Sequence, residues 1–234
     1  MIELDNISLA YGSRTIIEGG SAHLLRGELC ALIGRNGTGK STLLRAIIGH
    51  LRTTAGTIRL DGRDVATLSD ERKARLISFV STERIRIDNL LCEDVVATGR
   101  APYTNWIGQM QDADREIVGE ALREVGMEAF AHRSIATLSD GECQRIMIAR
   151  ALAQQTPIIL LDEPTAFLDI PTRFEMCRLL HRLAHEQQKC ILFSTHDIDA
   201  ALPACDSTLL IEKQGIRKVA IEQAKEVIAS LFGI

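Results

Sequence analysis

The sequence predicts an α/β fold in which parallel strands alternate with helices around a glycine-rich loop. A short apolar run over residues 28–33 precedes this loop and suits a buried parallel strand. Apolar residues at helical spacing follow the loop until Gly49, where a helix can end. Runs of the same buried-strand character recur at residues 158–162 and 189–194. This alternation is typical of a parallel sheet with helices on its faces.

The glycine-rich loop, Gly34–Thr42, fits the pattern G-x-x-x-x-G-K-[S/T]. A strand, such a loop and a helix start expose free backbone N–H groups and the positive end of the helix dipole to an anion. An ordinary glycine-rich turn is the alternative, but it does not explain the full motif together with its flanks. We therefore expect a nucleoside triphosphate to be bound by Gly34, Asn36, Gly37, Thr38, Gly39, Lys40, Ser41 and Thr42. In this motif Lys40 reaches the β- and γ-phosphates and the Ser41 hydroxyl ligates Mg²⁺.

Length and composition limit the possibilities further. A chain of 234 residues fits one large domain, or a domain with an inserted subdomain. The net charge of −4 gives no overall field that favours nucleic acid. The start of the chain lacks the pattern of a signal peptide, and no apolar run approaches the roughly 18 residues of a membrane helix. We expect a cytoplasmic chain whose role at a membrane, if it has one, goes through a partner.

Hydrophobic periodicity divides the chain into an α/β core and an inserted helical subdomain. Residues 84–155 are mainly helical, so the core is predicted over residues 1–83 and 156–234 of a single domain. Alternating strands over residues 2–26 and 56–61 predict an antiparallel β subdomain. The remaining expected elements are helices at 70–76, 112–125, 171–188 and 222–232 and strands at 76–80, 206–211 and 216–221. The apolar face of the helix at 171–188 is expected to carry Phe174, Cys177, Leu180 and Ala184, and Asp61-Gly62 is a hairpin-type turn signal.

Two adjacent carboxylates, Asp162 and Glu163, close the strand that begins at Ile158. The carboxyl ends of parallel strands face the ligand crevice, so Asp162 is expected to reach the Mg²⁺ held by Ser41. Glu163 points elsewhere, as successive side chains do, and can activate water at the γ-phosphate. The alternative is an acidic turn before Pro164, which leaves the pairing with the glycine-rich loop unexplained.

A second phosphate-binding signal lies at Leu138–Glu142. Ser139 and Glu142 have capping-box spacing, so a helix begins here, and its interior over residues 146–152 is apolar almost all round. A helix N-terminus that carries serine and glycine is itself an anion site. One triphosphate hardly needs two such helix N-termini, which favours a dimer in which this N-terminus of each copy closes on the nucleotide bound by its partner. Taken alone, the motif is equally consistent with an ordinary capped helix.

The order of these motifs resembles the nucleotide-binding subunit of an ABC transporter, a P-loop NTPase that binds ATP and Mg²⁺. The resemblance covers essentially the whole chain and runs through Tyr11, Gly34–Thr42, Leu138–Glu142, Ile158–Glu163, Phe167–Asp169 and His196. It implies that Tyr11 stacks on adenine and that Ser139, Gly141 and Glu142 contact ATP as parts of the signature motif. It implies catalytic roles for Glu163 as the base, Asp169 in the dimer-contacting loop and His196 as the γ-phosphate sensor.

The sequence departs from the family pattern at two places. In the signature motif, Asp140 replaces a glycine and Glu142 a glutamine. After the strand ending at residue 80, the family has a glutamine that contacts Mg²⁺, whereas this chain has Thr82-Glu83. Either the Thr82 hydroxyl or the Glu83 carboxylate could take over the contact, and both alternatives stay open, with Thr82 in register with the family glutamine.

The segment Asp94–Tyr103 is similar to importers of iron-siderophores, haem and cobalamin. The resemblance implies an ATPase subunit that forms a homodimer across two ATP molecules at the inner face of the cell membrane. There it drives integral membrane permease subunits that receive substrate from a binding protein, with no nucleic-acid partner. A soluble ABC ATPase of iron–sulfur assembly is the second interpretation. A nucleic-acid-acting ABC ATPase is the third, disfavoured by the acidic charge balance and by the single nucleotide domain.

Overall fold

The computed structural model spans residues 1–234 and describes all of them except 83–86, 105–109, 213 and 233–234. The strands are β1 (Ile2–Tyr11), β2 (Arg14–Leu24), β3 (Leu29–Ile33), β4 (Ala55–Leu60), β5 (Arg63–Asp64), β6 (Ile77–Val80), β7 (Ile158–Leu161), β8 (Cys190–Thr195), β9 (Ser207–Glu212) and β10 (Gly215–Ala220). The helices are α1 (Lys40–Ile47), α2 (Asp70–Leu76), α3 (Cys92–Ala97), α4 (Asp112–Glu124), α5 (Asp140–Ala153), α6 (Ile170–Glu186), α7 (Ile198–Ala201) and α8 (Ile221–Phe232). Short 3-10 turns are η1 (Val65–Thr67), η2 (Thr98–Tyr103), η3 (Glu128–Phe130), η4 (Ile135–Thr137) and η5 (Leu202–Ala204).

Two sheets carry the fold. The six-stranded sheet has the order β10-β9-β3-β8-β7-β6, and it is parallel from β9 to β6 with only β10 antiparallel at its edge. The four-stranded sheet, in the order β2-β1-β4-β5, is antiparallel throughout. The parallel sheet and the antiparallel β subdomain predicted from the sequence are therefore confirmed.

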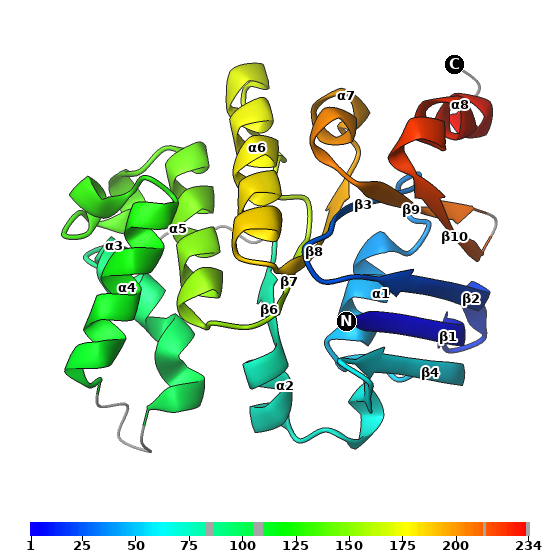
Figure 1. Cartoon of the computed structure of the whole chain (residues 1–234), viewed down its shortest axis with the longest axis horizontal. Coiled ribbons are helices and arrows are strands. Elements are labelled where there is room, and N and C mark those ends of the chain that lie inside the picture. The colour runs from blue at the N-terminus through cyan, green and yellow to red at the C-terminus, as the bar shows by residue number, and fades with distance from the viewer. Residues whose placement is uncertain (83–86, 105–109, 213, 233–234) are drawn as a thin grey trace.

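Strand β3 separates two hydrophobic cores, because successive side chains of a strand point to opposite faces. Leu29, Ala31 and Ile33 pack into the core beneath α6, while Cys30 and Leu32 pack into the core around α1 and the four-stranded sheet. Figure 1 shows α6, α7 and α8 on one side of the six-stranded sheet and α1 with the four-stranded sheet on the other. The glycine-rich loop leaves β3 between these two layers.

Helices α3, α4 and α5 pack together beside the edge of the six-stranded sheet, drawn green in Figure 1. Arg100 of η2, only 5% exposed, links α4 to α5: its Nε lies 2.9 Å from Asp114 Oδ1 and its Nη1 donates to Ala153 O at 2.8 Å. The backbone N–H of Gln111 and the Arg100 guanidinium lower the pKa of Asp114, so this buried pair stays charged at neutral pH.

Most predicted elements are confirmed to within two residues, and the expected apolar interior of α5 is buried from Ile146 onward except at Arg150. The turn at Asp61-Gly62 has positive φ at both residues, 52° and 75°, which is the twist a tight hairpin needs. Phe174 was expected on the buried face of α6, but it is 38% exposed. It lies in the first turns of that helix, where Ile170 is also exposed, and the buried residues of the helix begin only at Met176.

Within the described residues, none of the helices is both long enough and apolar enough to cross a membrane.

Candidate functional site

The glycine-rich loop joins the end of β3 to the first turn of α1. Gly39 adopts φ 108°, and a Cβ atom there would lie 2.3 Å from the Cγ2 atom of Ile16. Only glycine tolerates both the backbone conformation and this approach. The loop can therefore turn its backbone N–H groups inward at the positive end of α1, which is the arrangement that binds phosphate.

A cavity of about 430 Å³ opens in front of this loop. Its lining residues are Arg14, Ile16, Asn36, Gly37, Gly39, Lys40, Ser41, Thr42 and Glu163. Lys40 is 7% exposed, and its ammonium group donates to the carbonyl oxygen of Gly34 at 2.8 Å. The structure thus brings six of the predicted loop residues and Glu163 to one concave site, while the predicted residues Gly34 and Thr38 are not among its lining.

Glu163 reaches this cavity because the chain turns sharply after β7. Its φ angle is 50°, a left-handed conformation that is uncommon outside glycine. One oxygen of its carboxylate lies 3.9 Å from Lys40 Nζ, and the other lies 2.7 Å from His196 Nδ1. The side chain is 18% exposed, whereas that of His196 is 62% exposed. A carboxylate held between a cation and an imidazole at a phosphate site can accept a proton from water.

Asp162 and Glu163 are joined through Ser194, which the sequence analysis missed. The fully buried Ser194 hydroxyl donates to Asp162 Oδ1 at 2.6 Å and accepts the backbone N–H of Glu163 at 2.8 Å. Its signal in the sequence was weak: a serine near the end of a strand that pairs with β7, two residues before His196.

Arg14, in the lining of the cavity, was also missed, because β2 showed only ordinary strand alternation.

The N-terminus of α5 faces a second cavity, also of about 430 Å³. Its lining residues are Ser139, Asp140, Gly141, Glu142, Arg145, Phe167, Leu168, Asp169, Thr172 and Glu175. The structure therefore places the predicted residue Asp169 with the signature residues and not at the glycine-rich loop. The side chain of Asp169 caps α6 by accepting the Thr172 N–H at 2.9 Å, and hydrogen bonds from Thr172 lower its pKa.

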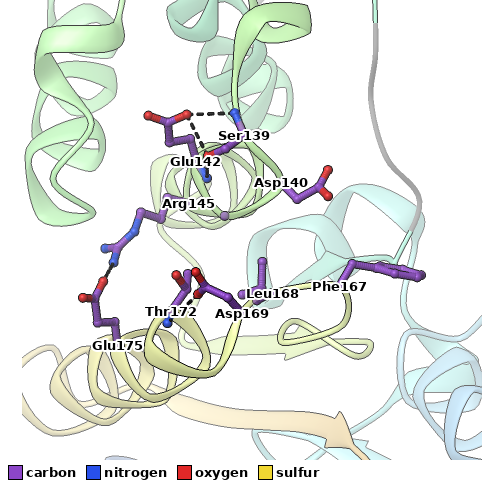
Figure 2. Close-up of a pocket in the computed structure, with 10 residues that line it drawn as sticks. Ser139, Asp140, Glu142, Arg145, Phe167, Leu168, Asp169, Thr172 and Glu175 are labelled. Atoms are coloured by element: carbon purple, nitrogen blue, oxygen red, sulfur yellow. Dashed lines mark hydrogen bonds and ion pairs between the residues drawn. The ribbon is translucent and has the colours of Figure 1, made fainter.

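The predicted capping box at Ser139 is confirmed. Figure 2 shows the Glu142 carboxylate turned back to Ser139, where it accepts the backbone N–H and the hydroxyl, each at 2.8 Å. These bonds, led by the backbone N–H, lower the pKa of Glu142. The carboxylate is therefore ionised at neutral pH. The N-terminus of α5 thus carries a negative charge that the glutamine of the family pattern would not have.

The N-termini of α5 and α6 approach each other closely at Gly141. A Cβ atom at this position would lie 3.0 Å from Thr172 Cγ2, so a larger residue would press on the side chain of Thr172. Farther along both helices, Arg145 Nη2 lies 2.9 Å from Glu175 Oε2 and links them across the cavity (Figure 2).

Tyr11 and Thr82 lie outside the lining of the cavity at the glycine-rich loop. Tyr11 ends β1, is 47% exposed and pairs across the hairpin with Arg14, whose strand reaches the cavity. Thr82 is exposed two residues beyond the end of β6. Glu83, the alternative to Thr82, lies outside the described residues.

The ligands expected for Mg²⁺ are consistent with that ion. The Ser41 hydroxyl and the Asp162 carboxylate are hard oxygen donors, the kind that Mg²⁺ prefers. Asp162 is 9% exposed and lies outside the lining of the cavity. Among the described residues, Ser194 bonds one of its two oxygens, which leaves the second for a cation.

Comparison with known proteins gives a consistent result. Residues 17–166 match the family described as ABC transporter. The chain is 39% identical over 216 residues to an uncharacterised ABC transporter ATP-binding protein of Methanocaldococcus jannaschii (92% of this chain, 74% of the relative). It is 36% identical over 215 residues to the petrobactin import ATP-binding protein FpuD of Bacillus anthracis (92% and 79%). It is 36% identical over 200 residues to the iron(3+)-hydroxamate import ATP-binding protein FhuC of Bacillus subtilis (86% and 74%).

Solved structures agree with these relatives. A structure reported as an inward-facing ABC transporter of the metal-chelate type superposes with a TM-score of 0.87 at 28% identity, over 100% of this chain and 89% of that one. A dimeric ATP-binding cassette in a post-hydrolysis state, bound to ADP and Pi, gives a TM-score of 0.80 at 28% identity, over 94% and 99%.

The glycine-rich loop at the end of a parallel strand, with Glu163 beside its lysine, defines the class of P-loop ATPases. Within that class the chain belongs to the ABC transporter family. It is an ATP-binding cassette, and its activity is the hydrolysis of ATP.

Proposed function

We propose that this cassette energises an importer of a metal chelate, in the range of iron-siderophores, haem and cobalamin. Two relatives at 36% identity are named for the import of petrobactin and of iron(3+)-hydroxamate. The likeness to a transporter of the metal-chelate type extends over the whole chain. The proposal also agrees with the segment Asp94–Tyr103, whose Arg100 and Tyr103 anchor it to α5.

The observation that carries the chemistry is the position of Glu163 between Lys40 and His196. In the proposed reaction, water attacks the γ-phosphorus of ATP, the bond to the β-phosphate oxygen breaks, and ADP leaves. Glu163 accepts the proton of the attacking water, and His196 holds the carboxylate in place. Lys40 and the backbone N–H groups of the loop balance the phosphate charge. Mg²⁺, when bound through Ser41 and Asp162, would neutralise further charge on the phosphates.

We further propose that two copies of the chain close on two ATP molecules. The cavity at the α5 N-terminus offers Ser139 and Gly141 at the positive end of a helix, a second place where phosphate can bind. Phe167 and Ile170 beside it are 71% and 67% exposed, and association would cover these apolar side chains. Asp169 lies between them, at the position where a partner copy would meet it.

The remaining partners follow from the same proposal. An integral membrane permease pair would receive the movement of the cassettes and hold them at the inner face of the cell membrane. A substrate-binding protein would deliver the chelate to the permease on the other side.

One experiment tests the reaction. We expect Glu163→Gln to lower turnover by roughly 10²–10⁴-fold while ATP binding persists. The same variant should accumulate as an ATP-bound dimer on gel filtration. Glu71→Gln is the matched control, since Glu71 pairs with Arg75 on the surface of α2. Near-normal hydrolysis by Glu163→Gln would rule out Glu163 as the base.

A second experiment tests the transport role. The cassette, its permease and its binding protein are assembled in vesicles, and uptake of ferric siderophore, haem and cobalamin is compared. ATP-dependent uptake of one chelate supports the proposal. Co-purification with soluble scaffold proteins of iron–sulfur assembly, and not with a permease, would contradict it.

A further inference from the structure

Two histidines on α6 and an aspartate just before β9 form a cluster that the ATPase chemistry does not use. His181 and His185 lie one turn apart, with ring centroids 4.1 Å apart. Asp206 approaches them, and the candidate ligand atoms, one from each of the three residues, all lie within 4.8 Å of one another. The side chains of His185 and Asp206 are 40% and 38% exposed, so an ion in solvent can reach them.

The hydrogen bonds of both imidazoles determine which ring nitrogen is available. His181 Nδ1 lies 2.7 Å from Ala204 O, and His185 Nδ1 lies 2.9 Å from His181 O. A carbonyl oxygen only accepts, so each Nδ1 must carry the proton. In the neutral rings the lone pairs are therefore on Nε2. Metal-binding histidines use this same arrangement, in which the second nitrogen donates to a carbonyl and fixes the ring.

Asp206 is held in place by Leu29, with one carboxylate oxygen near His185. Its Oδ2 accepts the N–H of Leu29 at 2.8 Å, and its own N–H donates to Leu29 O at 2.9 Å. Its Oδ1 lies 3.2 Å from His185 Nε2. With the proton on Nδ1, His185 Nε2 and Asp206 Oδ1 are both acceptors, and a metal ion between the two atoms could be coordinated by both.

We propose that His181, His185 and Asp206 bind one divalent transition-metal ion, with Zn²⁺ as the best match. Two imidazole nitrogens and one carboxylate oxygen are a typical Zn²⁺ ligand set, while Mg²⁺ and Ca²⁺ prefer oxygen donors alone. Two ligands at about 2.0–2.1 Å from a tetrahedral Zn²⁺ are about 3.3 Å apart, close to the spacing of His185 Nε2 and Asp206 Oδ1. The exposed His181 ring supplies the third ligand, since its candidate ligand atom lies within 4.8 Å of those of the other two residues, and water fills the fourth position.

This site is separate from the nucleotide site. Asp206 is bonded to Leu29 at the start of β3, whereas the glycine-rich loop follows the end of that strand. His185 lies 16 residues along the chain from Asp169, or about 24 Å along a helix. The metal joins the last turns of α6 to the start of β9, and it does not compete with Mg²⁺ at Ser41 and Asp162.

The test uses the full chain, stripped of metal with a chelator and free of nucleotide. Co²⁺ is titrated as a spectroscopic probe, and Zn²⁺ is then added to displace it. We expect one equivalent of Co²⁺ with the visible absorption of a tetrahedral site, released by one equivalent of Zn²⁺. His181→Gln, His185→Gln and Asp206→Asn should each weaken Zn²⁺ binding at least about tenfold.

The control is His132→Gln, since His132 is an exposed histidine 2.8 Å from Glu93. It should bind Zn²⁺ as the parent chain does. Thermal unfolding with chelator checks that the variants fold, and His181→Gln should match the parent chain there while losing the stabilisation that Zn²⁺ adds. ATP hydrolysis by His181→Gln should be unchanged. Absence of Zn²⁺ binding, or binding that none of the three substitutions weakens, would overturn the proposal.

Discussion

His196 Nδ1 lies 2.7 Å from Glu163 Oε2, so the imidazole at the end of β8 holds the carboxylate that follows β7. Neighbouring parallel strands make this contact possible, because Leu161 of β7 pairs with Phe193 of β8 and both chains leave the sheet at the same edge. The contact connects a role predicted for His196, sensing of the γ-phosphate, with the role predicted for Glu163. A histidine that touches both groups would link phosphate binding to the position of the base.

The first prediction concerns His196. His196→Ala should lower kcat by up to about 10²-fold, because the Glu163 carboxylate loses its partner and its orientation. The KM for ATP should change much less, since Lys40 and the loop remain. Steady-state ATPase measurements separate the two parameters. His132→Ala, which removes another exposed histidine–glutamate contact, should leave both unchanged. Equal kcat values for the two variants would refute the role of His196.

Several features of the fold could be predicted from the sequence because they depend on local chemistry. The glycine-rich loop, the capping box at Ser139 and the turn at Asp61-Gly62 each need particular residues at fixed spacing. The exposure of Phe174 could not be predicted, because periodicity finds an apolar face but not where along the helix its burial begins. The division at residues 83/84 and 155/156 stays a prediction.

The candidate site was predictable as a set of motifs but not as a geometry. Asp162 and Glu163 were expected to point apart, and the structure adds that Ser194 connects them through its hydroxyl. This contact spans 31 and 32 residues of sequence, and no local pattern encodes it. Likewise, Asp169 belongs to the α5 cavity because α5 and α6 begin side by side at Gly141, a packing relationship that spacing alone cannot give.

The second prediction concerns Tyr11. If its ring stacks on adenine, Tyr11→Ala should weaken ATP binding by about 1–3 kcal/mol, by analogy with the stacking of bases on aromatic side chains. Tyr11→Phe should preserve binding, because stacking uses the face of the ring. Fluorescence titration with an ATP analogue measures both. The Tyr11 ring is half exposed beside Arg14, so a base can reach its face. If Tyr11→Phe weakens ATP binding as much as Tyr11→Ala, the effect belongs to the hydroxyl.

The third prediction uses the lowered pKa of Glu142. A group whose pKa is lower in the folded chain than in the unfolded chain stabilises the fold when the pH is above its ordinary pKa, which is 4.5 for a glutamate. That contribution is lost as pH falls through the lowered value. The difference in unfolding free energy between the parent chain and Glu142→Ala should therefore be constant from pH 7 to about pH 5.5. It should shrink below pH 4.5.

Urea unfolding at a series of pH values measures this difference. We expect it to stay below about 1 kcal/mol, because the cap lies at an exposed helix end. Glu142→Gln retains an amide oxygen as acceptor and removes the titration, so it should show no such pH dependence relative to Glu142→Ala. A difference between the parent chain and Glu142→Ala that is independent of pH down to pH 3 would contradict the lowered pKa.

The fourth prediction concerns the residue that replaces the glutamine of the family. Val80 of β6 pairs with Leu161 of β7, and Asp162 N–H donates to Val80 O at 2.8 Å. Continuing this register brings Thr82 to the edge where Asp162 and Glu163 leave the sheet. Threonine is shorter than glutamine, so its hydroxyl would act on Mg²⁺ through a bridging water. We expect Thr82→Ala to lower permease-stimulated hydrolysis about two- to tenfold, the value of one hydrogen bond.

The competing possibility is that Glu83 provides the contact, and charge distinguishes the two. A carboxylate near Mg²⁺ attracts the metal but repels the γ-phosphate, so Glu83→Gln would then shift the Mg²⁺ dependence of hydrolysis strongly. If Thr82 acts, Glu83→Gln should be mild, and Thr82→Gln should be tolerated because it restores the family residue. Mg²⁺ titrations of ATP hydrolysis, with and without the permease, decide between them. Normal permease-stimulated hydrolysis in Thr82→Ala would exclude Thr82 and transfer the role to Glu83.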